Sequence, residues 1–356
     1  MVLSSTMGVT GYLLNILFLC VGVLLLVKGA DWFVASSSSI AKKFKVSSLI
    51  IGLTVVSFGT SAPELAVSTI SALKGESGIA LGNVVGSNFC NMALVLGLSA
   101  LISPILIKKS LCKREIPFLI LTTSVLIIFS YDNLLAGYTG IENILSRGES
   151  IIFLGLMVVY CYISIVLAKK ETEDPRETEG EQKFTEDEIV ELPMKKTLIL
   201  LVLGLTGIML GAEFVTTPAK NIATAIGTAI GVDDALLTTL VGLTVVAVGT
   251  SLPELVTSVV AAKKGENEIA VGNVVGSNIF NILLILGVSG IITPHKVSLD
   301  ITTDIVLTLV LTIIVLFFAK SGKLNRKQGL FLVIFYFAYL AYIVTRLFFP
   351  FIVIPA

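Results

Sequence analysis

Long apolar stretches, bounded by charges or turn residues, recur along the whole chain. About 20 apolar residues in a helix span the roughly 30 Å hydrocarbon core of a bilayer. The pattern predicts ten transmembrane helices, near residues 11–34, 46–71, 78–103, 114–131, 150–168, 196–218, 234–262, 269–293, 300–319 and 326–350. No basic segment precedes the first stretch and no small-residue cleavage site follows it, so we expect a permanent span rather than a signal peptide.

The composition points to the same class of protein. Hydrophobic residues fill 55% of the 356 positions and charged residues only 14%, with a mean hydropathy of +0.96. That balance is far from the one of a soluble domain, so we predict an all-α integral membrane protein. The four cysteines form no CxxC pair, and the single histidine, His295, cannot build a His-rich metal site. We expect His295 to be a loop residue at a helix end.

The chain contains an internal repeat. Residues 52–104 and 242–294 align without a gap and agree at 32 of 53 positions. Upstream, "KGADWFV" at 28–34 has a weaker counterpart in "LGAEFVT" at 210–216. Each half therefore holds five predicted spans, and because five is odd, the second half must cross the membrane in the opposite sense. Such inverted-topology repeats are typical of secondary transporters, whose sites lie near the midplane where discontinuous helices of the two halves meet.

An acidic segment separates the two halves. Residues 171–191 carry ten acidic residues against Arg176 and Lys183. We predict a first five-helix repeat over 1–168, a solvated linker over 169–195 and a second, inverted repeat over 196–356. Nineteen of the 25 Lys and Arg residues fall on the side of the linker, which predicts a cytoplasmic linker and both termini outside. A regulatory cation-binding role is the alternative for the linker, although its spacing does not match an EF-hand loop.

A proline and a glutamate interrupt one predicted span of each half, in "GTSAPEL" at 59–65 and "GTSLPEL" at 249–255. Proline removes a backbone N–H and frees the carbonyl four residues earlier, so each helix should break there. Thr60, Ser61, Thr250 and Ser251 would then lie at N-cap-like positions of a new half-helix, with Glu64 and Glu254 in its first turn. The positive end of that half-helix favours an ionised carboxylate.

Glutamates at bilayer depth are costly and usually functional. If the halves are inverted, Glu64 and Glu254 face one another, and two close carboxylates repel unless a proton or a cation lies between them. Surrounding hydroxyl and amide oxygens would complete an all-oxygen cage, which suits hard cations such as Ca²⁺ and Na⁺.

A second motif follows in each half, "GNVVGSN" at 82–88 and again at 272–278. Its GxxxG spacing predicts close helix packing. Ser87 and Asn91, and likewise Ser277 and Asn281, are spaced i, i+4 and share a helical face that could complete the cage. For Asn88 and Asn278 we favour hydrogen bonds between helices over ion contact, whereas the roles of Asn83 and Asn273 stay open.

These paired phrases resemble the α-repeats of the cation/calcium exchanger superfamily, and most closely its prokaryotic sodium/calcium exchanger branch. The resemblance implies an antiporter that exchanges cytoplasmic Ca²⁺ for external Na⁺ by alternating access, with no cofactor. Its partners would be the two ions and the lipid bilayer, with no nucleic acid and no protein partner. It implies that Glu64 and Glu254 are the central ligands, and that further oxygens come from Thr60, Ser61, Thr250, Ser251, Ser87 and Ser277 and from the backbone at Ser57 and Ala247.

Four alternatives bear on this interpretation. Relatives that exchange Ca²⁺ for protons share the glutamates, but their acidic residue in the second motif is missing here. Position 281 is asparagine where potassium-dependent relatives carry aspartate, which argues against a potassium requirement. An ion channel uses similar oxygen-lined groups, whereas an intramembrane enzyme is disfavoured because the chain has no HExxH or GxSxG motif. Since the first span of each half is rich in glycine and lacks the site motifs, we expect these two spans to move during transport.

Overall fold

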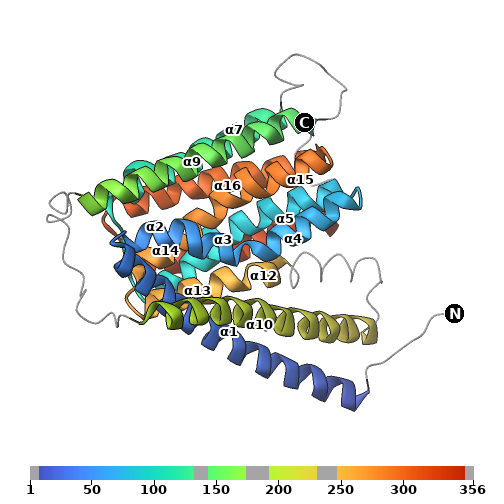
Figure 1. Ribbon diagram of the computed structural model, residues 1–356. Coiled ribbons are helices and arrows are strands. Elements are labelled where there is room, and N and C mark those ends of the chain that lie inside the picture. Colours follow the sequence, from blue (N-terminus) through green and yellow to red (C-terminus); the bar gives the residue numbers. More distant parts are fainter. Residues whose placement is uncertain (1–7, 132–142, 174–191, 231–246, 349–356) are drawn as a thin grey trace.

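The described residues form a bundle of helices (Figure 1). The structure, a computed structural model, describes residues 8–131, 143–173, 192–230 and 247–348. The described helices of the first half are α1 (Val9–Phe44), α2 (Ser48–Ile51), α3 (Ser57–Thr60), α4 (Ala62–Leu73), α5 (Ser77–Cys90), α6 (Leu96–Ile102), α7 (Ile116–Ser130) and α9 (Arg147–Glu173), with π-helical turns η1 (Gly52–Val56), η2 (Asn91–Val95) and η3 (Leu111–Glu115).

The second half repeats much of this order. Its described helices are α10 (Met194–Ala229), α12 (Ala247–Thr250), α13 (Leu252–Lys263), α14 (Asn267–Phe280), α15 (Leu286–Ile292), α16 (Leu299–Ala319) and α17 (Arg326–Phe348), with the π-helical turn η7 (Asn281–Ile285). Helix therefore reaches into both ends of the predicted linker, and residues 174–191 of that linker lie outside the described residues.

Seven helical stretches of the described residues are long and apolar enough to cross a membrane, and a bent pair gives an eighth if it counts as one span. They are Thr10–Phe44, Ser77–Ile102, Arg147–Leu167, Met194–Ala229, Asn267–Ile292, Asp300–Ala319 and Arg326–Arg346, with the bent pair Ser48–Thr60 and Ala62–Leu73. The predicted all-helical membrane class is confirmed. The number of ten spans stays a prediction. α7, with 15 residues, is too short to count as a span by itself, and the predicted span 234–262 lies partly outside the described residues.

The first predicted span ends too early, at residue 34, whereas α1 continues to Phe44. The helix passes through a run of four buried serines, Ser36–Ser39. The Ser36 hydroxyl donates to the Trp32 carbonyl at 2.6 Å, and the Ser38 hydroxyl donates to Glu266 Oε1 at 2.6 Å. Because the Ser36 and Ser38 hydroxyls find partners inside the protein, these two polar residues are compatible with a continuing helix.

The predicted end of the span near Pro218 is also wrong, because α10 includes this proline in its interior and ends at Ala229. α1 and α10 each have 36 residues. At 1.5 Å per residue each is roughly 54 Å long, well beyond the hydrocarbon thickness, so both helices must tilt or project from the bilayer.

α1 and α10 lie side by side along one face of the molecule, at the bottom of Figure 1. Glycines allow the two backbones to touch. A Cβ atom on Gly204 would lie 2.7 Å from the Phe33 backbone nitrogen, and one on Gly211 would lie 2.7 Å from that of Leu26. These close approaches make α1 and α10 a tightly packed pair, as small residues do between membrane helices.

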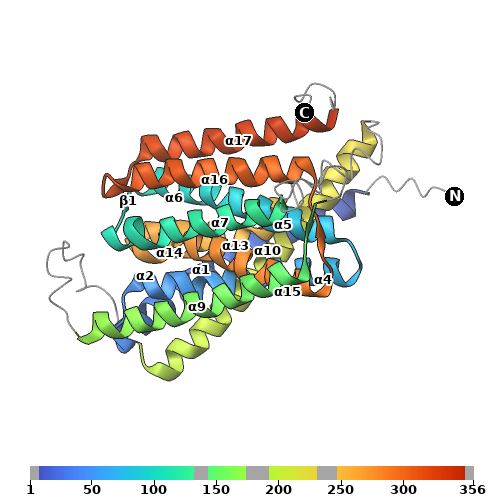
Figure 2. The ribbon, with the colours of Figure 1, turned by 90° about the horizontal axis from the view of Figure 1, so that it is seen from above.

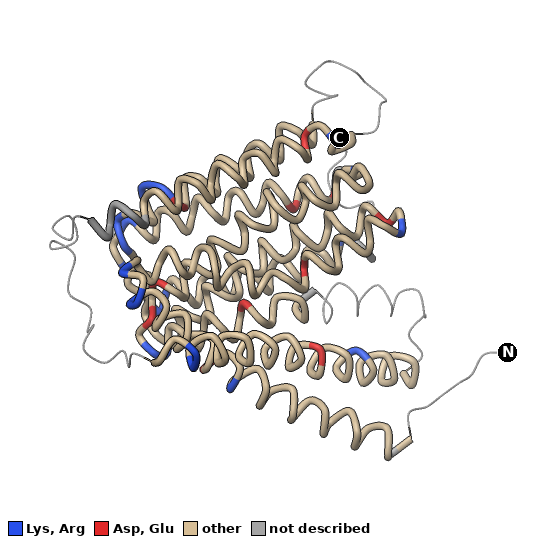
Figure 3. The backbone as a smooth tube through the Cα atoms, in the orientation of Figure 1, with Lys and Arg blue, Asp and Glu red and all other residues tan. Residues whose placement is uncertain are grey.

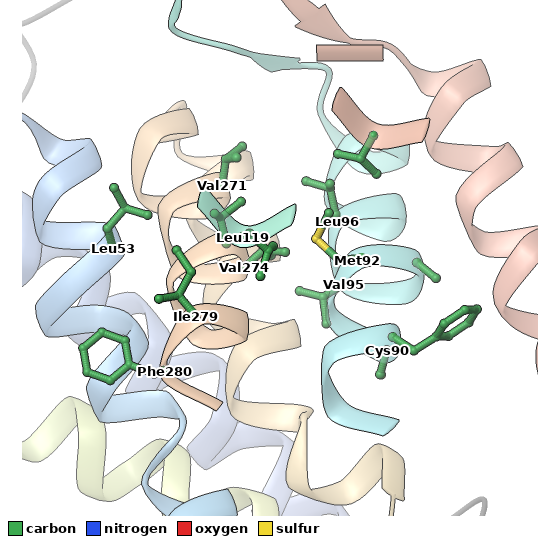
Figure 4. Close-up of a cluster of buried hydrophobic side chains, with 14 of the residues drawn as sticks. Leu53, Cys90, Met92, Val95, Leu96, Leu119, Val271, Val274, Ile279 and Phe280 are labelled. Atoms are coloured by element: carbon green, nitrogen blue, oxygen red, sulfur yellow. The ribbon is translucent and has the colours of Figure 1, made fainter. Parts of the chain in front are cut away.

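The two most buried spans run through the middle of the bundle. Ser77–Ile102 and Asn267–Ile292 are each 78% buried, whereas none of the other five unbroken candidate spans exceeds 39%. α7, α9, α16 and α17 lie on the opposite side of these spans from α1 and α10 (Figures 1 and 2). The apolar core between them includes Met92, Val95 and Val274 (Figure 4). The second motif of each half therefore occupies the centre of the protein.

Short strands join the two halves outside the helices. β1 (Ile105–Leu106) pairs antiparallel with β4 (Lys323–Leu324), and β2 (Ile144–Leu145) pairs antiparallel with β3 (His295–Lys296). Each pair takes one strand from each half of the chain. The contacts are reciprocal, because β1 and β3 occupy equivalent places in the repeat.

His295 lies just after α15, at a helix end as predicted, but it belongs to the short strand β3 and not to a loop. It is buried, with Nδ1 3.2 Å from the Ser77 carbonyl and Nε2 3.0 Å from the Ser289 hydroxyl. Burial lowers the pKa of His295 below its usual value of about 6.5. The folded state therefore favours the neutral ring, and the imidazole must be charged as the pH falls.

We accordingly expect the protein to lose stability as the pH falls from about 6.5 through the lowered pKa of His295. His295→Gln should lose less over this range, because glutamine retains hydrogen-bonding groups and does not titrate. Thermal unfolding of the purified protein in detergent between pH 7.5 and 5 measures the difference. Equal losses in the two proteins would contradict this role for His295.

Basic residues gather at one end of the bundle, at the left in Figure 3, where α1 ends and α10 begins. Few Lys or Arg residues lie at the opposite end (Figure 3). The predicted orientation, with a cytoplasmic linker, rests on this uneven distribution of Lys and Arg along the sequence.

Candidate cation-binding site

The predicted helix breaks are present in both halves. α3 ends at Thr60, Ser61 leaves helical geometry with φ −82° and ψ 5°, and α4 begins at Ala62. The bend between the two segments is 46°. In the second half Ser251, with φ −87° and ψ 4°, separates α12 from α13 in the same way. Proline follows at the second position of each new helix, where its missing N–H costs nothing.

The breaks place the glutamates in the first turn of α4 and α13, as predicted. Ser61 and Ser251 occupy the N-cap positions, but neither side chain caps its helix. Thr60 and Thr250 are instead the last residues of the preceding helices, so their predicted N-cap-like placement is wrong. The Ser61 hydroxyl is used across the protein, where it donates to Glu254 Oε1 at 3.1 Å.

Both glutamate side chains are fully buried. Glu254 Oε1 accepts hydrogen bonds from Ser61 and, at 3.4 Å, from the Ser277 hydroxyl. Among the described residues, no donor reaches Glu254 Oε2 or either carboxylate oxygen of Glu64, and the buried Ser251 hydroxyl also has no partner. Buried polar atoms are rarely left unpaired, because each costs about 1–3 kcal/mol. Oxygens of this kind are the ligands that hard cations use.

The carboxylates of Glu64 and Glu254 lie close enough together to repel each other when both are ionised. Ser87 lies next to Glu64, just as Ser277 lies next to Glu254. The Thr60 hydroxyl lies 3.4 Å from that of Ser277 and donates to Asn273 Oδ1 at 2.9 Å. Thr250 is only partly buried. Oxygen atoms from both halves of the chain therefore surround the glutamates.

Asn83 and Asn273, whose roles the sequence left open, hold the broken helices to the central spans. Asn83 Nδ2 donates to the Glu64 carbonyl at 3.4 Å and to the Ser68 hydroxyl at 3.0 Å. Asn273 Nδ2 makes the equivalent bonds, to the Glu254 carbonyl at 3.3 Å and to Ser258 at 2.9 Å. Sequence reasoning missed Ser68 and Ser258, although their conservation between the two copies was a usable signal.

Four asparagines join the central helices of the two halves. Asn88 Nδ2 donates to the Asn278 carbonyl at 3.2 Å, and Asn278 Nδ2 returns a bond to the Asn88 carbonyl at 3.1 Å. Asn91 and Asn281 donate to the side-chain oxygens of Asn278 and Asn88, at 3.0 and 2.9 Å. The predicted interhelical bonds of Asn88 and Asn278 are thus confirmed.

Asn91 and Asn281 were predicted as ion ligands, and each still has a buried side-chain oxygen without a partner among the described residues. Each also begins a π-helical turn. Such turns are rare and frequent at functional sites. No pattern in the sequence indicated these turns.

The backbone carbonyls of Ser57 and Ala247 were also expected to bind the cation. The Ser57 carbonyl already accepts the Ser61 N–H at 3.0 Å and the Thr60 hydroxyl at 3.3 Å, while the Ser57 hydroxyl donates to the Leu53 carbonyl at 2.7 Å. Ala247 begins α12, directly after residues 231–246, which lie outside the described residues.

The predicted GxxxG packing is present in the second half. A Cβ atom on Gly276 would lie 2.7 Å from the Leu53 carbonyl oxygen, and one on Gly272 would lie 2.9 Å from that of Leu49. These glycines let α14 pack against α2 and η1 of the first half. For Gly82 and Gly86, no close neighbour is found among the described residues.

The chain is similar to known proteins over most of its length. The family model described as sodium/calcium exchanger protein matches residues 14–166 and 196–345. The sodium/calcium exchanger MaX1 of Methanosarcina acetivorans is 35% identical over 349 residues, covering 92% of this chain and 97% of that protein. The putative antiporter CaxA of Alkalimonas amylolytica is 36% identical over 329 residues, covering 91% of this chain and 96% of that protein.

Solved structures of the sodium-calcium exchanger NCX_Mj are similar in fold. One of them, soaked with 10 mM Na⁺ and without Ca²⁺, has a TM-score of 0.75 at 32% identity, and the match covers 93% of this chain and 99% of that one. These relatives are transporters and not enzymes, in agreement with the prediction from the sequence. The chain therefore belongs to the sodium/calcium exchanger family.

Proposed function

We propose that the protein is a secondary antiporter that exchanges Ca²⁺ for Na⁺ across the membrane by alternating access. One observation carries this proposal. Three carboxylate oxygens of Glu64 and Glu254 and the hydroxyl of Ser251 are buried without a hydrogen-bond donor among the described residues. The two carboxylates come from different halves of the chain, and a cation between them would compensate both charges.

The ligands follow from the same arrangement. Glu64 and Glu254 supply the charge, and neutral oxygens complete the coordination. The neutral ligands proposed are Thr60, Ser61, Thr250, Ser251, Ser57, Ala247, Ser87, Asn91, Ser277 and Asn281. Ca²⁺ and Na⁺ have similar radii, so one set of oxygens can bind each in turn. Two Na⁺ ions balance the same two negative charges as one Ca²⁺, and a third Na⁺ would make the exchange electrogenic.

The proposed topology has ten transmembrane helices in two inverted five-helix repeats, 1–168 and 196–356, joined by the linker 169–195. The repeated helix breaks and the reciprocal asparagine bonds between the halves support it. The gathering of basic residues at one end supports a cytoplasmic linker with both termini outside. In an inverted pair the site lies between the halves, where access can alternate.

Alternating access requires one group of helices to move against another. The α1–α10 pair is the proposed moving unit, because its two helices pack backbone to backbone through glycines while the glutamates lie on α4 and α13. Such a pair can move as one body past the site without rearranging the ligands.

Exchange of Ca²⁺ for protons is the second candidate, since two facing carboxylates can also carry protons. The surplus of neutral oxygens around them favours Na⁺, because a proton needs none of these ligands. A channel would have a similar lining, but its flux would not need a counter-ion on the opposite side.

The test is ⁴⁵Ca²⁺ uptake by proteoliposomes loaded with Na⁺, at the same pH on both sides. We expect uptake that requires internal Na⁺ and stops when choline replaces it. A matched set of vesicles without Na⁺ receives a pH gradient instead. Uptake that follows the pH gradient and ignores Na⁺ would favour the proton-coupled alternative, and uptake without any counter-ion would indicate a channel.

A further inference from the structure

Two polar contacts tie α1 to the loop between α13 and α14 at one end of the bundle. Lys264 Nζ lies 2.6 Å from Asp31 Oδ1 and donates to the Asp31 carbonyl at 3.0 Å. Two helical turns further along α1, the Ser38 hydroxyl donates to Glu266 Oε1 at 2.6 Å. These contacts, which we name the first latch, hold the end of α1 against the half of the protein that contains Glu254.

The internal repeat gives each member of the first latch a counterpart. Asp31 aligns with Glu213 in "KGADWFV" and "LGAEFVT", and Lys264 and Glu266 align with Lys74 and Glu76. Seven residues after Glu213, the position equivalent to Ser38 is Lys220. The counterparts are complementary at both contacts, because Glu213 would meet Lys74 and Lys220 would meet Glu76.

In the structure these counterpart residues do not contact one another across α10 and α4. Lys74, Glu76, Glu213 and Lys220 are all exposed. Among the described residues, no ion pair or hydrogen bond joins these α10 side chains to Lys74 or Glu76, and Glu213 instead accepts a hydrogen bond from Thr217 within α10. The helix packing shows the same difference between the halves. α1 packs along α13, whereas α10 makes no comparable contact with α4, and both α10 and α4 are fully described.

We propose that Glu213 and Lys220 bind Lys74 and Glu76 in the opposite access state, in which the Asp31–Lys264 and Ser38–Glu266 contacts of the first latch are broken. This inference rests on the alternating access of the proposed function. It assigns a role to eight side chains that do not reach the cations: they are positioning residues that hold the α1–α10 pair at either end of its movement. One latch closes as the other opens, so the two access states have similar stability.

Cysteine pairs test this directly. After the four native cysteines are replaced by alanine and exchange is verified, cysteines are introduced at 213 and 74, at 31 and 264, and at the mismatched positions 74 and 264, which also lie in different halves. A short, reducible bis-thiosulfonate reagent is added to proteoliposomes during Ca²⁺ exchange. Residues 1–173 and 192–356 are then separated by protease at a site inserted into 174–191, so that only crosslinked halves stay together on a denaturing gel.

We expect the 31/264 and 213/74 pairs to crosslink, the 74/264 pair to stay uncrosslinked, and reductant to restore the exchange that each crosslink stops. Lys74→Glu should raise crosslinking at 31/264 by about two- to fivefold, the size of one exposed ion pair, and adding Glu213→Lys should reverse this. Absence of the 213/74 crosslink in an exchange-active protein, or of the 31/264 crosslink, would overturn the proposal. The gel does not depend on which cation is coupled, so this failure is distinct from failure of Na⁺ coupling.

Discussion

Glu64→Gln and Glu254→Gln are each expected to abolish Ca²⁺ exchange while leaving the protein folded. Both side chains are fully buried, and the variant keeps the shape of the side chain but removes one of the two negative charges. A divalent cation would then lose an ionised partner in a buried site, at a cost of roughly 3–5 kcal/mol, or about a hundredfold or more in affinity. The measurement is Na⁺-dependent ⁴⁵Ca²⁺ uptake by proteoliposomes.

Asp300→Asn is the matched control for this prediction. It also removes one acidic charge, but the Asp300 side chain is 63% exposed at the start of α16, away from the site. We expect this variant to exchange Ca²⁺ normally. Near-normal uptake by either glutamine variant, with a monodisperse and thermally stable protein, would mean that the cation site lies elsewhere.

Gly204→Val is expected to reduce exchange at least tenfold while preserving Ca²⁺ binding. A Cβ atom at position 204 would lie 2.7 Å from the Phe33 backbone nitrogen and 2.8 Å from the Gly29 carbonyl oxygen. Backbone atoms cannot rotate away, so α1 and α10 must separate, and overpacking of this kind usually costs about 1–3 kcal/mol. The site glutamates lie on α4 and α13, and their geometry need not change.

Variants of two further glycines serve as controls for Gly204→Val. A Cβ atom on Gly155 of α9 meets no described atom within 4 Å, so Gly155→Val should exchange normally. At Gly207 the nearest atom would lie 3.3 Å away, so Gly207→Ala should give a milder loss than Gly204→Val. Comparing ⁴⁵Ca²⁺ binding with uptake in all three separates movement from folding. Full exchange by Gly204→Val would argue against a tightly coupled α1–α10 pair.

Part of this structure could be predicted from residues that constrain the local backbone or helix packing. Pro63 and Pro253 cannot continue a helix bond, so the breaks and the glutamates beside them follow from the sequence. The GxxxG spacing of Gly272 and Gly276 likewise predicted the close helix packing found there. The polar residues Ser36 and Ser38 made the predicted span end too early, because their hydroxyls find partners within the protein and the helix continues.

Other features depend on contacts that no single segment encodes. The π-helical turns at Asn91 and Asn281 arise from a shift of backbone hydrogen bonds within helices of ordinary composition. The bond from Ser61 to Glu254 joins residues 193 positions apart in the chain, so it needs the packed halves to exist. The same holds for the bonds of Asn83 and Asn273, whose partners appear only once the broken helices are in place.

The central claim is that a single site formed by Glu64 and Glu254 serves Ca²⁺ and Na⁺ in turn. Equilibrium binding of ⁴⁵Ca²⁺ to the purified protein, measured at constant pH and ionic strength as Na⁺ replaces choline, tests it most directly. Because two or more Na⁺ ions must take the place of one Ca²⁺, we predict complete displacement of Ca²⁺ with a Hill coefficient for Na⁺ above 1. Bound Ca²⁺ that is unaffected by Na⁺ would contradict the claim.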